Sequence, residues 1–159
     1  MRNIVLARVD ERLIHGQVIT SWLKLCDANA IVIIDDASAT NAFLKRILFA
    51  AAPKNIALQV LTEAEAADYL KQDAPAGERV LLLAKTPGPM LKTIKSGIEL
   101  KEITLGNMSG AAGRKRFNKN IFATEQEVQD FRDIVASGTD IYCQMVPSDA
   151  KDDIKKLLV

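Results

Sequence analysis

Several features that define large classes of proteins are absent from this sequence. Histidine occurs once, at His15, and the two cysteines, Cys26 and Cys143, lack the spacing of metal ligands. No apolar run approaches the roughly 18 residues that a membrane-spanning helix needs, and the N-terminus has no signal-peptide pattern. The 21 basic and 20 acidic residues give a net charge of +1, so electrostatics provide no reason to expect a nucleic-acid partner. We therefore expect a cytoplasmic protein with no metal and with two buried free thiols.

What is present is the composition of an ordinary globular protein. The chain has 159 residues, of which 48% are apolar and 26% are charged, and a domain of this size buries roughly 70% of its unfolded surface. No internal repeat, low-complexity segment or linker divides the chain. We expect a single domain over residues 1–159.

Short apolar runs alternate with segments of helical periodicity along the whole chain. This alternation, with short connections, predicts an α/β domain with an open, mainly parallel, twisted sheet of about seven strands and helices on both faces. The expected strands span about 3–8, 30–34, 56–61, 79–84, 102–105, 120–123 and 140–146. The expected helices span about 16–26, 41–51, 62–71, 87–97, 124–136 and a short segment capped by Pro147-Ser148.

Local signals support several of these helices. Thr62 and Thr124 each begin a capping-box sequence, and Pro87 suits the first position of a helix. Trp22 recurs at helical spacing with its apolar neighbours, which predicts a core position. The second helix is expected to carry one apolar stripe, formed by Phe43, Leu44, Ile47, Leu48 and Ala51.

A charged, glycine-containing loop follows the first strand and contains the only histidine. In open parallel sheets, ligands bind beyond the carboxyl ends of the strands, where this loop is expected to lie. Residues that follow other strands would form the rim of the same site, and these are Asp35, Lys85, Gly106 and Asn107.

A histidine near arginines and a helix N-terminus suits nucleophilic attack on a phosphoryl group. The positive end of the helix dipole disfavours imidazolium, so His15 would be neutral and nucleophilic. The amides of Gly16 and Gln17 would favour the incoming phosphate. Such a transfer needs no metal and no cofactor if guanidinium and backbone donors stabilise the charge.

Three charged residues before the histidine complete this hypothesis. Arg12 and Arg8 offer forked donors to the equatorial phosphate oxygens, where negative charge must be held during transfer. Asp10 either fixes the imidazole tautomer through the other ring nitrogen or positions an arginine.

The residues alone leave other interpretations open. A lone histidine at a strand-to-helix turn is often structural, and Arg8 with Asp10 forms, in that interpretation, a surface pair worth under about 1 kcal/mol. The basic run 114–119 is either a solvated loop or a surface that docks an acidic partner or closes over phosphate. The glycine-rich loop 106–113 lacks both a Walker-type lysine and a complete GxGxxG pattern.

The string RVDERLIHGQV, residues 8–18, closely resembles the active-site loop of the enzyme IIB components of the mannose/fructose/sorbose family. These are cytoplasmic subunits of the bacterial phosphoenolpyruvate-dependent sugar phosphotransferase system. Later segments also resemble family positions, in the expected order, at 34–36, 85–87, 106–108 and 144–147. Segment 106–108 with its basic continuation looks most like the N-acetylgalactosamine-type branch, whereas segment 37–41 lacks an acidic residue that many members have.

The resemblance implies a phosphocarrier. His15 would accept phosphate on Nδ1 from a phosphohistidine of a IIA protein and pass it to a sugar held by membrane IIC and IID subunits. Arg12 would be the transition-state arginine, with Arg8 and Asp10 supporting the loop. The family further implies a homodimer, peripheral association with the membrane permease, and no nucleic-acid partner. Because donor and acceptor must both reach His15, the histidine should be exposed.

Two other classes of function compete with this interpretation. A signalling receiver domain needs a phospho-accepting aspartate at the end of the third strand, where the chain has Leu61-Thr62. A nucleotide-binding domain would use the glycine-rich loop 106–113, but neither the motif nor its position fits. The phosphotransferase hypothesis is therefore preferred.

Overall fold

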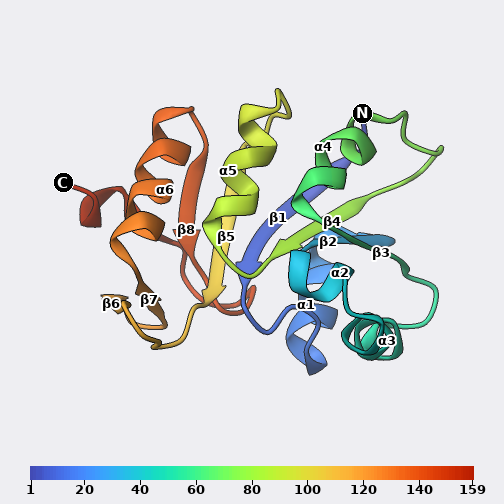
Figure 1. The fold of residues 1–159 in the computed structure, drawn as a ribbon, viewed down its shortest axis with the longest axis horizontal. Coiled ribbons are helices and arrows are strands. Elements are labelled where there is room, and N and C mark those ends of the chain that lie inside the picture. Colours follow the sequence, from blue (N-terminus) through green and yellow to red (C-terminus); the bar gives the residue numbers. More distant parts are fainter.

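The apolar runs form a seven-stranded sheet in the order β3-β2-β4-β1-β5-β8-β9. This arrangement is seen in a computed structural model, which describes residues 1–159 except the side chain of Gln17. All neighbouring strands are parallel except β8 and β9. This confirms the predicted α/β fold with a mainly parallel sheet (Figure 1). The strands are β1 (Ile4–Asp10), β2 (Ala30–Ile34), β3 (Ala57–Leu61), β4 (Val80–Ala84), β5 (Glu102–Asn107), β8 (Asp140–Cys143) and β9 (Asp152–Asp153).

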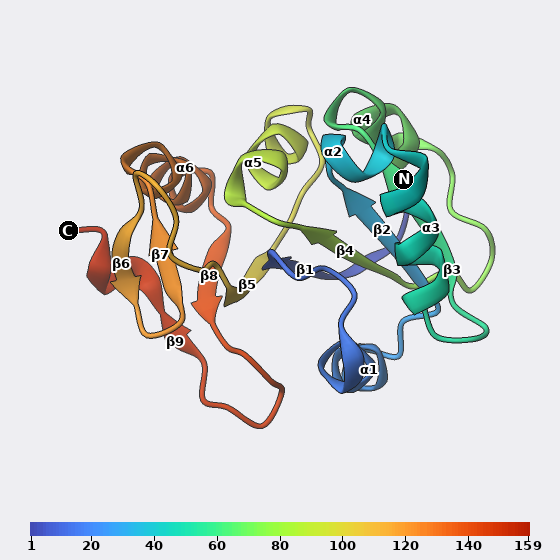
Figure 2. The same ribbon diagram turned by 60° about the horizontal axis from the view of Figure 1, so that its bottom comes forward.

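Helices cover both faces of the sheet, with α1 on the opposite side from α4, α5 and α6 (Figure 2). The helices are α1 (Gly16–Cys26), α2 (Asp36–Ala39), α3 (Ala42–Ala51), α4 (Glu63–Lys71), α5 (Pro87–Lys95) and α6 (Glu125–Ala136). Both predicted capping boxes are formed, at Thr62 and at Thr124. None of the helices in the described part of the chain is long and apolar enough to cross a membrane.

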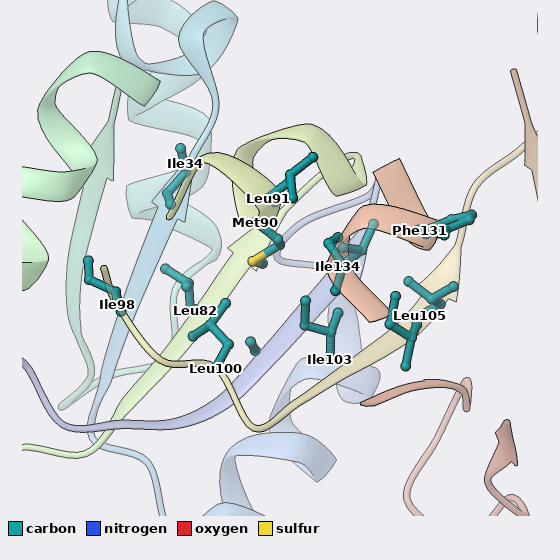
Figure 3. Packing of buried hydrophobic residues seen from close by; sticks show 14 of the residues in the cluster. Ile34, Leu82, Met90, Leu91, Ile98, Leu100, Ile103, Leu105, Phe131 and Ile134 are labelled. Atoms are coloured by element: carbon teal, nitrogen blue, oxygen red, sulfur yellow. The ribbon is translucent and has the colours of Figure 1, made fainter. Parts of the chain in front are cut away.

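Strand β4 shows why the central strands lack an alternating pattern. All five of its residues are buried, because one set of side chains packs toward α1 and α3 and the other toward α5 and α6. Figure 3 shows Leu82 in the second layer, near Met90 of α5 and Ile103 of β5. Full burial of a leucine side chain contributes about 1.5–3 kcal/mol. Two apolar layers therefore hold the sheet rigid from both sides, including β1 at its centre.

Two segments after β5 differ from the prediction. The basic run forms a hairpin of β6 (Lys115–Asn118) and β7 (Ile121–Ala123), outside the main sheet, where a loop and one strand were expected. Strand β8 ends at Cys143 rather than near residue 146. Pro147-Ser148 does not cap a helix, because the chain first forms β9 and then a short 3₁₀ helix, Ile154–Leu157, capped by Asp153.

Predictions about individual side chains had mixed outcomes. Trp22 is a core residue with 2% exposure, as predicted. In α3, Leu48 is buried, but Phe43 and Ile47 are 62% and 48% exposed, so only part of the predicted stripe faces the core. The short helix α2 was missed because its four residues are too few to show a period. Both cysteines are free and half-buried.

Candidate active site

The loop that carries the histidine leaves β1 at the carboxyl edge of the sheet and is anchored by apolar side chains. Leu13 and Ile14 are buried in the layer under α1. Leu13 adopts a left-handed backbone conformation, with φ of 55°, and its amide donates to the Asp10 carbonyl at 2.9 Å. This tight turn places His15 at the N-cap of α1, where its backbone is extended and its ring makes no capping bond. The ring is therefore available to other partners.

His15 and Asp10 form the central contact of the site. Nε2 of His15 lies 3.3 Å from Oδ2 of Asp10. The carboxylate is 1% exposed and the imidazole 21% exposed, so the histidine is half-buried rather than fully open. A carboxylate accepts, so the bond requires the proton on Nε2 and leaves the lone pair on Nδ1. No partner of Nδ1 is found among the described residues.

The surroundings favour a neutral imidazole. Burial lowers the pKa of His15 below its ordinary value of 6.5, Asp10 opposes this shift, and the charges of Arg12 and Arg8 add to it. The net direction is downward. At neutral pH the ring is therefore unprotonated at Nδ1, as a nucleophile must be.

Arg12 lies on the solvent side of the same carboxylate. Its Nε and Nη2 lie 3.3 Å from Oδ1 and Oδ2 of Asp10, and its amide donates to Oδ1 at 3.0 Å. Its side chain is 42% exposed. Arg12 and His15 thus contact the same carboxylate, and the partly exposed guanidinium keeps donors that can bind an anion.

Arg8 is placed differently from the forked phosphate clamp that we expected. It is 1% exposed, and its Nη1 and Nη2 donate to the carbonyls of Gln144 and Met145 at 2.7 and 2.6 Å. The guanidinium also stacks on the Trp22 ring at 4.5 Å and lies 3.6 Å from Asp10. Burial lowers the pKa of Arg8 to about 10, so it stays charged at neutral pH. Its donors hold the chain after β8, and its charge contributes to the lowered pKa of His15.

Two of the expected rim residues, Gly106 and Asn107, lie next to Asp10. A Cβ atom on Gly106 would lie within 3.0 Å of the Arg8 guanidinium and the Asp10 carboxylate, so only glycine fits. Asn107 pairs with Asp10 across the sheet, and its Nδ2 donates to Glu11 at 3.3 Å. Both residues shape the site from β5.

The other two expected rim residues form a separate pair. Lys85 lies 3.2 Å from Asp35, whose side chain also accepts from the Ser38 amide at the start of α2. No bond from this pair to the His15 loop is found among the described residues. Asp35 thus acts as the N-cap of α2 rather than as part of the rim of the site.

Helix α1 begins at Gly16, as predicted from the sequence. Gly16 is the first residue of α1 and has φ of +46°, a conformation that favours glycine. The prediction for Gln17 lies outside the described residues. Within the described part of the chain, no group of three or more His, Cys, Asp or Glu side chains is arranged to hold a metal ion.

The structure adds residues to which the sequence gave no role. Glu11 accepts from the Ser109 amide at 2.8 Å and from Arg114 at 3.1 Å. Met145 receives bonds from Arg8 and from the Trp22 indole through its carbonyl, and its Sδ lies 3.2 Å from Arg12. The one available signal for Glu11 was that it is a second carboxylate, next to Asp10 in the sequence.

Comparison with known proteins places this loop in a family. Residues 4–159 match the family model "PTS system sorbose subfamily IIB component". The chain is 32% identical over 158 residues to the N-acetylgalactosamine-specific phosphotransferase enzyme IIB component 2 of Escherichia coli (strain K12), covering 99% of this chain and 100% of that protein. It is 30% identical over 148 residues to the mannose-specific EIIAB component of the same strain, covering 93% of this chain and 46% of that longer protein.

A solved structure agrees with the sequence relatives. The crystal structure of the IIBSor domain of the sorbose permease from Klebsiella pneumoniae has a TM-score of 0.92 and 29% identity, covering 98% of this chain and 96% of that chain. IIB components are phosphotransferases of sugar transport. The family predicted from the loop is thereby confirmed: this chain belongs to the sorbose subfamily of IIB components, within the mannose/fructose/sorbose family of the sugar phosphotransferase system.

Proposed function

We propose that this chain is a phosphocarrier in which His15 is the phosphorylated residue. It accepts a phosphoryl group from the phosphohistidine of a IIA protein or domain and passes it to a sugar of the mannose, fructose, sorbose or N-acetylgalactosamine class. The observation that supports the proposal is the 3.3 Å contact between His15 Nε2 and the buried Asp10, because a proton shared with the carboxylate leaves Nδ1 with its lone pair.

In the first transfer, the Nδ1 lone pair attacks the phosphorus of the donor. A bond between Nδ1 and phosphorus forms while the bond between phosphorus and the donor nitrogen breaks, and the donor imidazole keeps the electron pair. The His15 ring becomes positively charged because Nε2 keeps its proton. The Asp10 carboxylate stabilises this charge at 3.3 Å.

The negative charge on the transferred phosphoryl group must also be stabilised, by hydrogen-bond donors. The equatorial oxygens carry the negative charge of the transition state, and donors aimed at them lower the barrier. Arg12 supplies a guanidinium that shares the Asp10 carboxylate with the ring, and the start of α1 supplies backbone amide donors. The proposed transfer uses no metal ion and no cofactor.

In the second transfer, a sugar hydroxyl attacks the same phosphorus. The bond from phosphorus to Nδ1 breaks, the hydroxyl proton is released to solvent, and the neutral imidazole, still protonated on Nε2, is restored. The sugar is proposed to be bound by membrane IIC and IID subunits during uptake, so the chain would work in the cytoplasm, peripherally associated with that permease. Fusion of IIA to IIB in the mannose-specific relative supports IIA as the donor. A homodimer and no nucleic-acid partner complete the proposal.

The relay is tested by following one phosphate through both steps. The chain is labelled with radioactive phosphoenolpyruvate, the general system proteins and a cognate IIA, then separated and mixed with membranes that contain the cognate IIC and IID. Loss of label from the chain with matching sugar phosphate is the expected result. A labelled chain that releases only inorganic phosphate with every sugar of the class would contradict the proposal.

A further inference from the structure

Arg114 was expected to belong to a solvated or partner-docking basic run, but its side chain points into the protein. It is 11% exposed. Its Nε and Nη2 donate to the two carboxylate oxygens of Glu127, each at 3.0 Å, in a forked pair. Its Nη1 donates to Glu11 at 3.1 Å and to the Ser109 carbonyl at 2.8 Å. One guanidinium therefore joins the first turn of α6, the loop after β5 and the loop that carries His15.

Glu11 is the point at which this network enters the candidate site. Its carboxylate accepts from Arg114, from the Ser109 amide and hydroxyl, and from Asn107. Its own amide donates to the Asn107 carbonyl at 3.0 Å. Burial alone would raise the pKa of Glu11, but the hydrogen bonds from Ser109 and Arg114 lower it. Both the backbone and the side chain of Glu11 are thus fixed.

The residues on either side of Glu11 are the ones that contact the imidazole or its carboxylate. Asp10 precedes it and lies 3.3 Å from His15, and Arg12 follows it. Asp10 is also held by its strand, whereas Arg12 and the residues up to His15 lie in a turn with no strand or helix. The fixed side chain of Glu11 is therefore the polar anchor at the start of that turn.

We propose that Arg114 is a positioning residue for the phosphotransfer: it holds the His15 loop through Glu11, with α6 as the rigid support. This inference rests on the proposed function of His15. Arg114 touches neither the ring nor Arg12, so its effect must pass through Glu11.

The alternative role of the basic run offers a matched control. Lys115 and Arg116, next in the chain, are exposed and lie on the hairpin strand β6. A partner that docks on this basic surface would contact Lys115 more readily than Arg114. Lys115→Ala therefore removes one positive charge from the same segment without touching Glu11.

The test compares Arg114→Ala, Arg114→Lys, Glu11→Ala, the double variant Arg114→Ala/Glu11→Ala and Lys115→Ala. The rate of His15 phosphorylation by phospho-IIA is measured first. The His15 pKa is measured separately, from the proton NMR signal of the only imidazole in the chain, without any partner present. Thermal unfolding of each variant reports its fold.

We expect Arg114→Ala to slow transfer about tenfold or more, because small misplacements of reacting groups have effects of this size. The His15 pKa should rise toward 6.5 as the loop admits water. The double variant should be no slower than the slower single variant, Arg114→Lys should recover part of the rate, and Lys115→Ala should transfer normally. If Arg114→Ala does not fold, Arg114→Lys and Glu11→Ala are compared in the same two measurements.

Two results would overturn the inference. One is a variant of Arg114 that folds, transfers within twofold of Lys115→Ala and keeps the wild-type His15 pKa. The other is a double variant whose loss of rate equals the product of the two single losses, since the two residues would then act independently. Failure of the wild-type chain to take up phosphate on His15 would instead contradict the proposed function, and the NMR measurement would still report whether Arg114 positions the ring.

Discussion

Asp10 and His15 form a buried carboxylate–imidazole pair in which Nε2 lies 3.3 Å from Oδ2 and the carboxylate is 1% exposed. The same carboxylate also receives Arg12 and lies 3.6 Å from Arg8. One acidic group therefore contacts the histidine and both neighbouring arginines. The tautomer of His15, and with it the lone pair on Nδ1, depends on this side chain.

Replacing Asp10 with asparagine should keep the shape of the pair and remove its charge. Because the carboxylate raises the pKa of His15, its loss should lower that pKa further. Transfer should slow by about 10- to 100-fold, as is usual when the residue that orients a functional histidine is lost. NMR titration of the single imidazole and a phosphorylation assay measure the two effects. An unchanged pKa would show that the pair does not exist in solution.

The pH dependence of phosphorylation follows from the lowered pKa of His15. Only the neutral ring attacks, so the rate should fall on acidification with a midpoint below 6.5, the ordinary value. A histidine with an unshifted pKa would already have lost half its rate at that pH. Initial rates from phospho-IIA between pH 5 and 8 measure the midpoint. A midpoint above 6.5 would mean that Asp10 outweighs burial.

Arg12→Ala should slow transfer by about 100-fold or more with little change in stability, by analogy with the loss of other transition-state donors. Its side chain is 42% exposed, so its removal leaves no buried cavity. Thermal unfolding with a transfer assay separates the two effects. Normal transfer by a folded Arg12→Ala protein would show that this arginine has no part in the chemistry.

Gly106→Ala should lower the free energy of unfolding by about 1–3 kcal/mol, the usual cost of overpacking. The added methyl group would lie within 3.0 Å of the Arg8 and Asp10 side chains, so transfer should fall as well. Gly110→Ala is the control, because a Cβ atom there meets only Phe122, at an ordinary 3.8 Å. Denaturant titration of both variants measures the difference. Equal stability of the two proteins would contradict the packing described for Gly106.

Strands buried on both faces were the easiest part of the fold to predict. Residues 30–34 and 80–84 are apolar without interruption, because helices cover both sides of them. The hairpin β6–β7 lacked such a signal, since Lys115 and Arg116 are exposed and charged. In α3, periodicity identified the helix but not its orientation, because apolar residues occupy more than one of its faces.

The candidate site also has a part that could be predicted from the sequence and a part that could not. The histidine, its arginines and its aspartate are close in the sequence, so one short string was enough to predict them together. The roles of Arg8 and Arg114 depend on carbonyls and carboxylates that are 136 and 103 residues away. Contacts of this range arise from the order of the strands, which no local pattern contains. A buried arginine and an exposed one therefore looked alike in the sequence.

The central claim is that the phosphoryl group is carried by Nδ1 of His15, and the position of the label tests it most directly. Wild-type chain and His15→Gln are incubated with labelled phosphoenolpyruvate, the general system proteins and a cognate IIA, then compared for acid-labile phosphate. We expect one phosphate on the wild-type chain, assigned by NMR to Nδ1 of His15, and none on the folded variant. Label on His15→Gln at the wild-type level would contradict the account.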